Sequence, residues 1–390
     1  MDEKMTDILK IRMRCFLLDK SYVWFVPEEA PILCRYDLDK RLIDFLKEIP
    51  QCEGTYSTIV KYKEKLVLIP FSAKKVAIFS VEKLDFLMIN LPETDFKFRE
   101  NMKFMDGFVV GTSVVLIPAG FPFFLKIDMD TLEIKKSSNW CLQYEDYINE
   151  TDGCVAIVSG IWDQENILYV GINKQTSNDK SCLGVVQLDS LEIQFKKVPY
   201  IKTWYRNVNL IGEKLYICSA DGDIVIMDKD GEYAEKISAC TLKNIEDVEG
   251  VYIACTYYHN NLYYYKVNGG VWEFDLKTQV MSQSLLIKKP IIYAKLFDGY
   301  HVLVQAQEKG VFYLVDDNIS VSKYDFEIDK ELKNSFFIKL LNRDNYISES
   351  VFASLGSFCT MVQDNLEEKM IQNENIGRQI YDSVNQMISY

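Results

Sequence analysis

The residue types that most often carry chemistry are sparse or poorly spaced in this chain. It has two histidines, His259 and His301, and neither has a second histidine beside it, which leaves little for metal binding or general-base catalysis. The ten cysteines are scattered singly and form no C-x-x-C pair, so neither a zinc ribbon nor a thioredoxin-like motif is present. We therefore expect no cofactor and no metal, and we interpret both histidines as surface side chains.

Carboxylate pairs and glycines suggest no active site by their spacing. Glu28/Glu29 and Glu145/Asp146 are adjacent pairs, and adjacent residues on a strand point in opposite directions, so neither pair forms an acid/base couple. No G-x-S-x-G motif occurs, and Gly153, Gly160 and Gly171 are too far apart for a phosphate-binding loop. An enzyme that assembles histidine, tyrosine and cysteine from distant parts of the chain remains open as an alternative.

Composition and charge describe a folded protein with an acidic balance. The 390 residues include 57 acidic and 44 basic side chains, a net charge of −13, and 48% are hydrophobic. Such a balance argues against a nucleic-acid partner, because phosphate contacts need clustered lysine and arginine. No apolar run approaches the roughly 18 residues that span a bilayer, so we expect no membrane insertion. Cys15, Cys218 and Cys255 lie in apolar segments, which favours small buried thiols in a reducing cytoplasm.

An internal repeat organises most of the chain. A unit of three strand-like segments separated by turns recurs seven times, and its equivalent positions are 22, 66, 114, 167, 215, 262 and 302. A further strand-like segment precedes each copy, at 11–18, 57–62, 107–112, 154–160, 207–212, 251–258 and 291–297. A period of roughly 40–50 residues is typical of four-stranded propeller blades. We therefore predict an all-β fold, a seven-bladed β-propeller of four-stranded antiparallel blades over residues 1–327.

Aspartates close the third strand of most copies. They are Asp37, Asp128, Asp189, Asp228, Asp275 and Asp316. A short carboxylate before a tight turn can accept backbone N–H groups that the strand ladder leaves unpaired. We interpret these residues as turn-stabilising and not catalytic.

The repeat resembles the blades of the kelch and galactose-oxidase-like propeller superfamily. The resemblance covers about residues 11–327 and includes Gly269-Gly270-Val271-Trp272 in the sixth copy. The rhythm LVLIPFSAKKVAIFSVEK, from Leu66, is also similar to uncharacterised bacterial cytoplasmic kelch-like proteins with a helical C-terminus. The resemblance implies the fold and a cytoplasmic setting, and it transfers no catalytic residue.

Residues 328–390 change from strand-like to helical periodicity. Leu355, Phe358, Val362 and Leu366 recur at helical spacing. We predict a short C-terminal α-helical extension packed on the propeller near the join between its first and last blades, through residues such as Phe336 and Leu355. An alternative is that the helices pair in a dimer or bind a partner helix, so the oligomeric state stays open. The first copy already has four strands, so we predict that no strand is exchanged to close the ring.

Aromatic side chains gather in the segments that join one blade to the next. Such residues supply rigid contact area for a peptide or a sugar. The candidate binding residues are Phe71, Phe121, Phe123, Trp140, Tyr144, Tyr147, Tyr200, Trp204, Tyr205 and Arg206. The competing interpretation is that Trp140, Trp204 and Tyr205 fill the space between blades.

The function that these observations favour is a non-enzymatic interaction scaffold that binds a protein or peptide partner through the propeller loop face. The alternative is an enzyme or a glycan-binding protein with a site at the mouth of the central channel. Three or more convergent polar side chains with shifted pKa values at that mouth would favour the alternative. A mouth filled by phenylalanine and tyrosine, with an exposed apolar patch elsewhere, would favour the scaffold.

Overall fold

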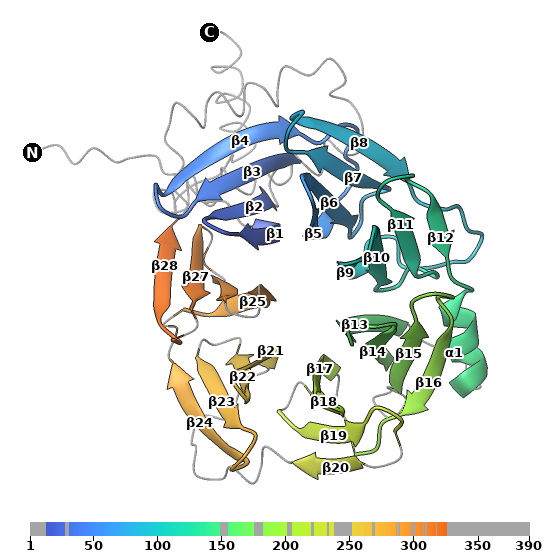
Figure 1. Ribbon diagram of the computed structural model, residues 1–390, viewed down its shortest axis with the longest axis vertical. Helices are drawn as coiled ribbons and strands as arrows, with labels where there is room; N and C mark the ends of the chain where they lie inside the picture. The colour runs from blue at the N-terminus through green and yellow to red at the C-terminus, as the bar shows by residue number, and fades with distance from the viewer. Residues whose placement is uncertain are drawn as a thin grey trace, which may run out of the picture.

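The protein is a ring of seven four-stranded antiparallel sheets, as the computed structural model in Figure 1 shows. The structure describes residues 13–27, 31–148, 155–174, 182–200, 205–219, 222–231, 234–237, 252–266, 270–285, 287, 289–297, 301–306, 308, 310–316 and 318–325. Each sheet is one blade whose strands follow one another in sequence from the axis outward. The prediction of a seven-bladed β-propeller is confirmed.

The first four blades hold residues 13–197. Blade 1 contains β1 (Met13–Asp19), β2 (Tyr22–Pro27), β3 (Ile32–Asp37) and β4 (Leu42–Glu48). Blade 2 contains β5 (Tyr56–Tyr62), β6 (Lys65–Pro70), β7 (Lys75–Ser80) and β8 (Asp85–Asn90). Blade 3 contains β9 (Phe104–Val110), β10 (Ser113–Pro118), β11 (Leu125–Asp128) and β12 (Ile134–Lys136). Blade 4 contains β13 (Val155–Trp162), β14 (Ile167–Lys174), β15 (Cys182–Gln187) and β16 (Ile193–Lys197).

The other three blades complete the ring. Blade 5 contains β17 (Tyr205–Ile211), β18 (Lys214–Ser219), β19 (Ile224–Asp228) and β20 (Ala234–Ile237). Blade 6 contains β21 (Tyr252–Tyr258), β22 (Asn261–Lys266), β23 (Val271–Asp275) and β24 (Val280–Leu285). Blade 7 contains β25 (Ile291–Phe297), β26 (His301–Ala306), β27 (Val311–Val315) and β28 (Val321–Asp325).

Burial within a blade follows the hydrophobic pattern of its strands. The middle strands β6 and β7 are near-continuous apolar runs and are buried on both faces, because neighbouring blades pack against each face. The outer strands β4 and β8 instead alternate between exposed and half-buried residues. The hydrophobic cores consequently lie between blades, as clusters that each combine side chains from two or three of them.

The turn role of the aspartates is confirmed where their carboxylates accept backbone hydrogen bonds. Asp128 Oδ1 accepts the N–H groups of Asp130 and Thr131 at 2.9 and 2.8 Å, and Asp37 and Asp275 make the same pair of bonds. The backbone donor three residues further on is the main cause that lowers the pKa of each of these three carboxyl groups. The prediction for Asp189 was wrong, because β15 ends at Gln187 and Asp189 lies within the following turn.

One segment that the sequence analysis treated as a loop is a helix, α1 (Trp140–Ile148). Asn139 caps its first turn, since Asn139 Oδ1 accepts the N–H groups of Cys141 and Leu142 at 3.0 and 3.3 Å. The helix lies outside blades 3 and 4, next to β16 (Figure 1). Its buried face carries Trp140 and Tyr144, which pack into the core between these blades.

The ring closes without exchange of a strand between its ends. Blade 1 has the order β1-β2-β3-β4 and blade 7 has the order β25-β26-β27-β28, so each blade is complete, as predicted. The predicted helical extension, residues 328–390, lies outside the described residues, and its packing on the propeller stays a prediction. Within the described chain, side-chain packing is what joins blade 7 to blade 1.

We call this junction the seam, and aromatic rings fill it. On the blade 1 side, Tyr36 packs edge-on against Phe312 and Tyr324, with ring centroids 5.6 and 6.1 Å apart. Phe312 in turn stacks on Tyr324 at 4.9 Å. Nearer the axis, Phe16 packs against Phe297 at 5.9 Å. Aromatic pairs in such geometries add roughly 0.5–1.5 kcal/mol each beyond the area that they bury.

Removal of one seam ring should loosen the closure. Phe312 is fully buried, so Phe312→Ala is expected to lower the free energy of unfolding by about 3–5 kcal/mol. It should also make the protein self-associate with increasing concentration, because an opened seam exposes the faces of two blades. Thermal unfolding and size-exclusion chromatography measure the two effects.

Phe79→Ala is the matched control for this variant. Phe79 is equally buried, but it lies between blades 1 and 2. These two blades are also connected covalently, by the loop between β4 and β5. It should lose comparable stability without the concentration-dependent association. An unchanged melting temperature for Phe312→Ala would contradict the role given to the seam.

Candidate functional site

The innermost strand of every blade carries a β-bulge at the same place, close to its start. In β5, Tyr56 pairs with Pro70 and Thr58 pairs with Ile69 of the neighbouring strand β6. Ser57 is therefore an extra residue that is paired with no residue of β6. The seven extra residues are Arg14, Ser57, Met105, Val158, Arg206, Ile253 and Ile292. Bulges re-aim side chains and are frequent beside binding sites. Here they form one level around the propeller axis.

This level lies at the face where the last strand of each blade connects to the first strand of the next. We call it the loop face, and we call the opposite face, with the hairpin turns between first and second strands, the turn face. The residues directly after the bulges form a second level, made of Cys15, Thr58, Asp106, Ser159, Asn207, Ala254 and Tyr293. Most of these residues are polar, although inner strands otherwise supply apolar core.

Three polar side chains from three blades meet at this level. Lys295 of β25 donates hydrogen bonds from Nζ to Thr58 Oγ1 at 2.7 Å and to Asp106 Oδ1 at 2.8 Å. Asp106 Oδ1 also accepts the N–H group of Gly107 at 2.9 Å. We call Thr58, Asp106 and Lys295 the axial cluster. It joins blade 7 to blades 2 and 3, past the inner strand of blade 1.

Water reaches the axial cluster even though it lies on the innermost strands. The side chain of Lys295 is 20% exposed and that of Asp106 is 37% exposed. Tyr293, two residues before Lys295 in β25, is 38% exposed, while its ring packs edge-on against Phe16 at 5.4 Å. Lys295 and Asp106 are therefore accessible to solvent, whereas Thr58 is 1% exposed.

Opposing effects act on the Lys295 ammonium. Burial among the inner strands is the largest single effect and lowers its pKa, but the Asp106 carboxylate, with a smaller contribution from Tyr293, raises it, and the pKa ends above its ordinary value. Lys295 is consequently held in its charged form at neutral pH. Because the folded pKa is raised, the stabilisation by this pair is fully present below the unfolded value of about 10.4 and is lost as the pH rises through the folded pKa.

Two further cations lie at the loop face without a carboxylate partner among the described residues. Arg206 is the bulge residue of β17, its Nε is buried without a hydrogen bond, and burial lowers the pKa of its guanidinium. Lys103, directly before β9, is 6% exposed and donates from Nζ to the carbonyls of Ser72 and Glu100 at 2.8 and 2.6 Å. Burial also lowers the pKa of Lys103, against an opposing effect of Glu100.

Four of the ten expected binding residues are buried between blades. They are Phe121, Trp140, Tyr144 and Tyr205, each at most 2% exposed. The Trp140 Nε1–H group donates to the Phe121 carbonyl at 2.7 Å, so this ring fixes the chain within the core. These four side chains support the fold, and a partner cannot contact them in this arrangement.

The remaining expected residues have different placements. Tyr200 is 56% exposed at the loop face, and Phe71 and Phe123 are half-buried there. Arg206 lies on the innermost strand at the bulge level. Trp204 and the side chain of Tyr147 lie outside the described residues. Of the ten, Arg206 is the one that shares a level with the axial cluster.

Sequence analysis missed all three members of the axial cluster. Each looks unremarkable in its own segment, because a single threonine, aspartate or lysine in a strand suggests an outward-facing side chain. Alignment of the seven inner strands on their first pairing residue would have placed Thr58 and Asp106 at one level. Lys295 lies two residues further along its strand, and only its long side chain brings its ammonium back to that level.

Other candidate sites are less developed. His259 and Asn260 form a two-residue hairpin turn with positive φ angles, and the histidine ring stacks on Tyr258 at 3.9 Å. In the described part of the chain no three metal-binding side chains gather. Among the helices described, none is long and apolar enough to cross a membrane.

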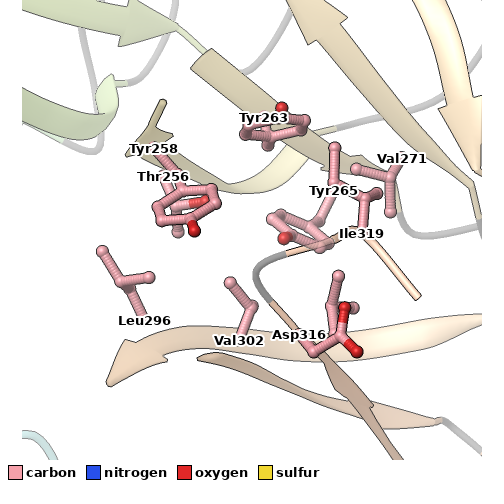
Figure 2. Close-up of a pocket in the computed structure, with 10 residues that line it drawn as sticks. Thr256, Tyr258, Tyr263, Tyr265, Val271, Leu296, Val302, Asp316 and Ile319 are labelled. Carbon is pink, nitrogen blue, oxygen red and sulfur yellow. The ribbon is translucent and has the colours of Figure 1, made fainter. Parts of the chain in front are cut away.

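A crevice opens between blades 6 and 7 at the turn face. Figure 2 shows Tyr258, Tyr265, Asp316 and Ile319 around it. It contains about 310 Å³, including solvent at its opening, and most of its lining is apolar. Asp316 Oδ1 accepts the N–H groups of Asn318 and Ser320 at 2.9 and 2.8 Å, so this carboxylate stabilises the turn. The crevice lies at the opposite end of the strands from the axial cluster.

Comparison with known proteins supports the fold alone. No family model matches the chain, and no curated protein matches it. Among solved structures, virginiamycin B lyase from Staphylococcus aureus is 11% identical, with a TM-score of 0.55 over 78% of this chain and 94% of that chain. YCF48 from Cyanidioschyzon merolae is 9% identical, with a TM-score of 0.55 over 84% of this chain and 98% of that chain.

Neutralising the axial ion pair should reveal coupling between its two charges. Asp106→Asn leaves the Lys295 ammonium without its counter-charge, and Lys295→Met leaves the Asp106 carboxylate without one. The free energies of unfolding lost in the two single variants should therefore add up to more than the loss in the double variant. For a partly exposed pair we expect a coupling of about 1–2 kcal/mol at pH 7 from a double-mutant cycle in urea. The coupling should vanish above the raised pKa of Lys295. Additive effects at pH 7 would show that the two charges do not interact.

Proposed function

We propose that this protein is a non-enzymatic interaction module that binds a segment of a protein partner at its loop face. The observation that carries the proposal is the axial cluster, where Lys295, Asp106 and Thr58 converge from three blades at a level that water reaches. A polar group of the partner would contact this cluster, while Tyr200 and the half-buried Phe71 and Phe123 would contribute apolar contacts around it.

The protonation state of Lys295 favours recognition over catalysis. A lysine that acts as a base or a nucleophile needs a lowered pKa, so that the free amine is populated at neutral pH. Lys295 has a raised pKa, because the Asp106 carboxylate holds it as an ammonium against the effect of burial. The carboxylate is in turn engaged by this ammonium and by a backbone N–H group. The cluster therefore suits the recognition of a polar group of a partner better than proton transfer.

A finer assignment belongs to the same proposal. We infer a kelch-like protein of the bacterial cytoplasm, with protein or peptide as its partner and no nucleic acid. The resemblance of the repeats supports the kelch-like origin, and seven free thiols in the described chain support a reducing compartment. Residues 328–390 would pack on the propeller as a helical extension.

The second candidate is a glycan-binding protein or an enzyme at the same place. Convergence of three polar side chains with one shifted pKa favours it, and Tyr293 offers an exposed aromatic surface for a sugar. Binding of wild-type protein on a glycan array, with loss of that binding in Lys295→Met, would favour this candidate over a peptide partner.

Peptides selected from a random displayed library should bind at the loop face. Tyr200→Ser removes an exposed aromatic side chain there, and we expect it to weaken binding of the selected peptides about tenfold, a loss of about 1.4 kcal/mol. Fluorescence anisotropy with labelled peptides measures the affinities.

Val280→Ser is the matched control, because Val280 is 57% exposed at the turn-face end of the outer strand β24. It should leave the affinities unchanged. If the peptides depend on Val280 and not on Tyr200, or bind both variants like wild type, then the loop face is not the binding surface.

A further inference from the structure

The charge around the axis at the loop face has the opposite sign to that of the whole chain. Among the side chains that the structure describes, the loop-face halves of the inner strands carry one carboxylate, Asp106, and one arginine at a bulge position, Arg206. The ammonium of Lys295 reaches the same level, since it binds Thr58 and Asp106 directly after the bulges of their strands. Two described cations, Arg206 and Lys295, thus lie at this level with one described anion, Asp106, in a chain with a net charge of −13.

Arg206 is the least compensated of these cations. Its guanidinium forms no ion pair or hydrogen bond with any described residue, and its Nε is buried. A charge taken from water without a partner costs free energy, which is why burial lowers its pKa. An anion that binds to such a cation offsets this free-energy cost. The planar guanidinium group can donate two parallel hydrogen bonds to a carboxylate.

No carboxylate within the described part of the chain pairs with Arg206. The acidic side chains of the loop-face segments that lie close to lysines are already paired with them. Glu53 binds Lys74, Asp223 binds Lys236, and Glu308 binds Lys289. Asp106 is shared with Lys295, which leaves Arg206 free to bind a group from outside.

Long-range repulsion opposes an acidic ligand, because the chain as a whole is negative. Screening limits that effect, since the field of exposed charges decays over about 8–10 Å at physiological salt. Over short distances the contact with Arg206 itself decides the interaction, and a desolvated guanidinium binds a carboxylate more strongly than an exposed one does.

We propose that the loop-face site recognises an acidic peptide segment, with a glutamate or aspartate carboxylate of the partner bound by Arg206, which shares the bulge level of the inner strands with the Lys295–Asp106 pair. This inference rests on the proposed function and names the chemistry of its partner.

The test is a selection of peptides from a random twelve-residue library on the full-length protein, followed by affinity measurements on variants. The recovered peptides should be enriched in glutamate and aspartate. Their affinity should fall at least tenfold on Arg206→Met, which keeps the length of the side chain, and should largely return with Arg206→Lys, which restores the charge. Thermal unfolding of each variant confirms that it remains folded.

Lys61→Met is the control, because Lys61 is a cation on the inner strand β5 but lies toward the turn face, bound to Asp19 at 2.5 Å. It should leave the affinities unchanged. Peptides that need Tyr200 but show no acidic enrichment and no dependence on Arg206 would overturn this inference and leave the proposed function standing. Failure to recover any peptide that binds the loop face would overturn both.

Discussion

Packing of aromatic rings across one seam holds this propeller closed, and the candidate site exists only in the closed ring. Six of the seven junctions between blades are also linked by the chain, whereas Tyr36, Phe312 and Tyr324 join blade 7 to blade 1 through side chains. Lys295 lies on blade 7, and both of its partners lie beyond blade 1, on blades 2 and 3. The axial cluster therefore depends on the closure and adds a polar tie across it.

The same arrangement explains how a ring of apolar strands can present a charged site. Each inner strand begins with a bulge, which interrupts the ladder at the loop face and turns polar side chains toward the axis. At this level burial works against the charged form of a side chain, so its pKa depends on whether an opposite charge lies next to it. Lys295 pairs with a carboxylate and keeps a raised pKa, whereas Arg206 pairs with no carboxylate of the described residues and has a lowered pKa. This difference separates a fixed structural pair from a cation that is available to a ligand.

The sequence predicted the architecture because strand periodicity and turn chemistry are local. The seven copies and the aspartate turns at Asp37, Asp128 and Asp275 depend on residues a few positions apart. Helix α1 was missed because one short amphipathic segment rich in aromatics resembles a loop when its surroundings are strands. The axial cluster could not be predicted, because Thr58 and Lys295 are 237 positions apart and only ring closure brings them together. For a similar reason aromatic content marked Tyr144 as a binding residue, although the gap between two blades buries it, and the competing interpretation of Trp140 and Tyr205 as side chains that fill such a gap is the one that their burial supports.

Hydrogen exchange of the native protein in low concentrations of urea, followed by mass spectrometry, tests whether the seam is the weakest junction of the ring. Amides of β1 and β25 should become exchangeable together, with one opening free energy that is lower than that of β9 and β13. Opening of the seam would then precede global unfolding and would separate Lys295 from Asp106 in the same step. If β1 and β25 open independently, or are protected as strongly as β9 and β13, then the closed ring does not depend on the seam as described.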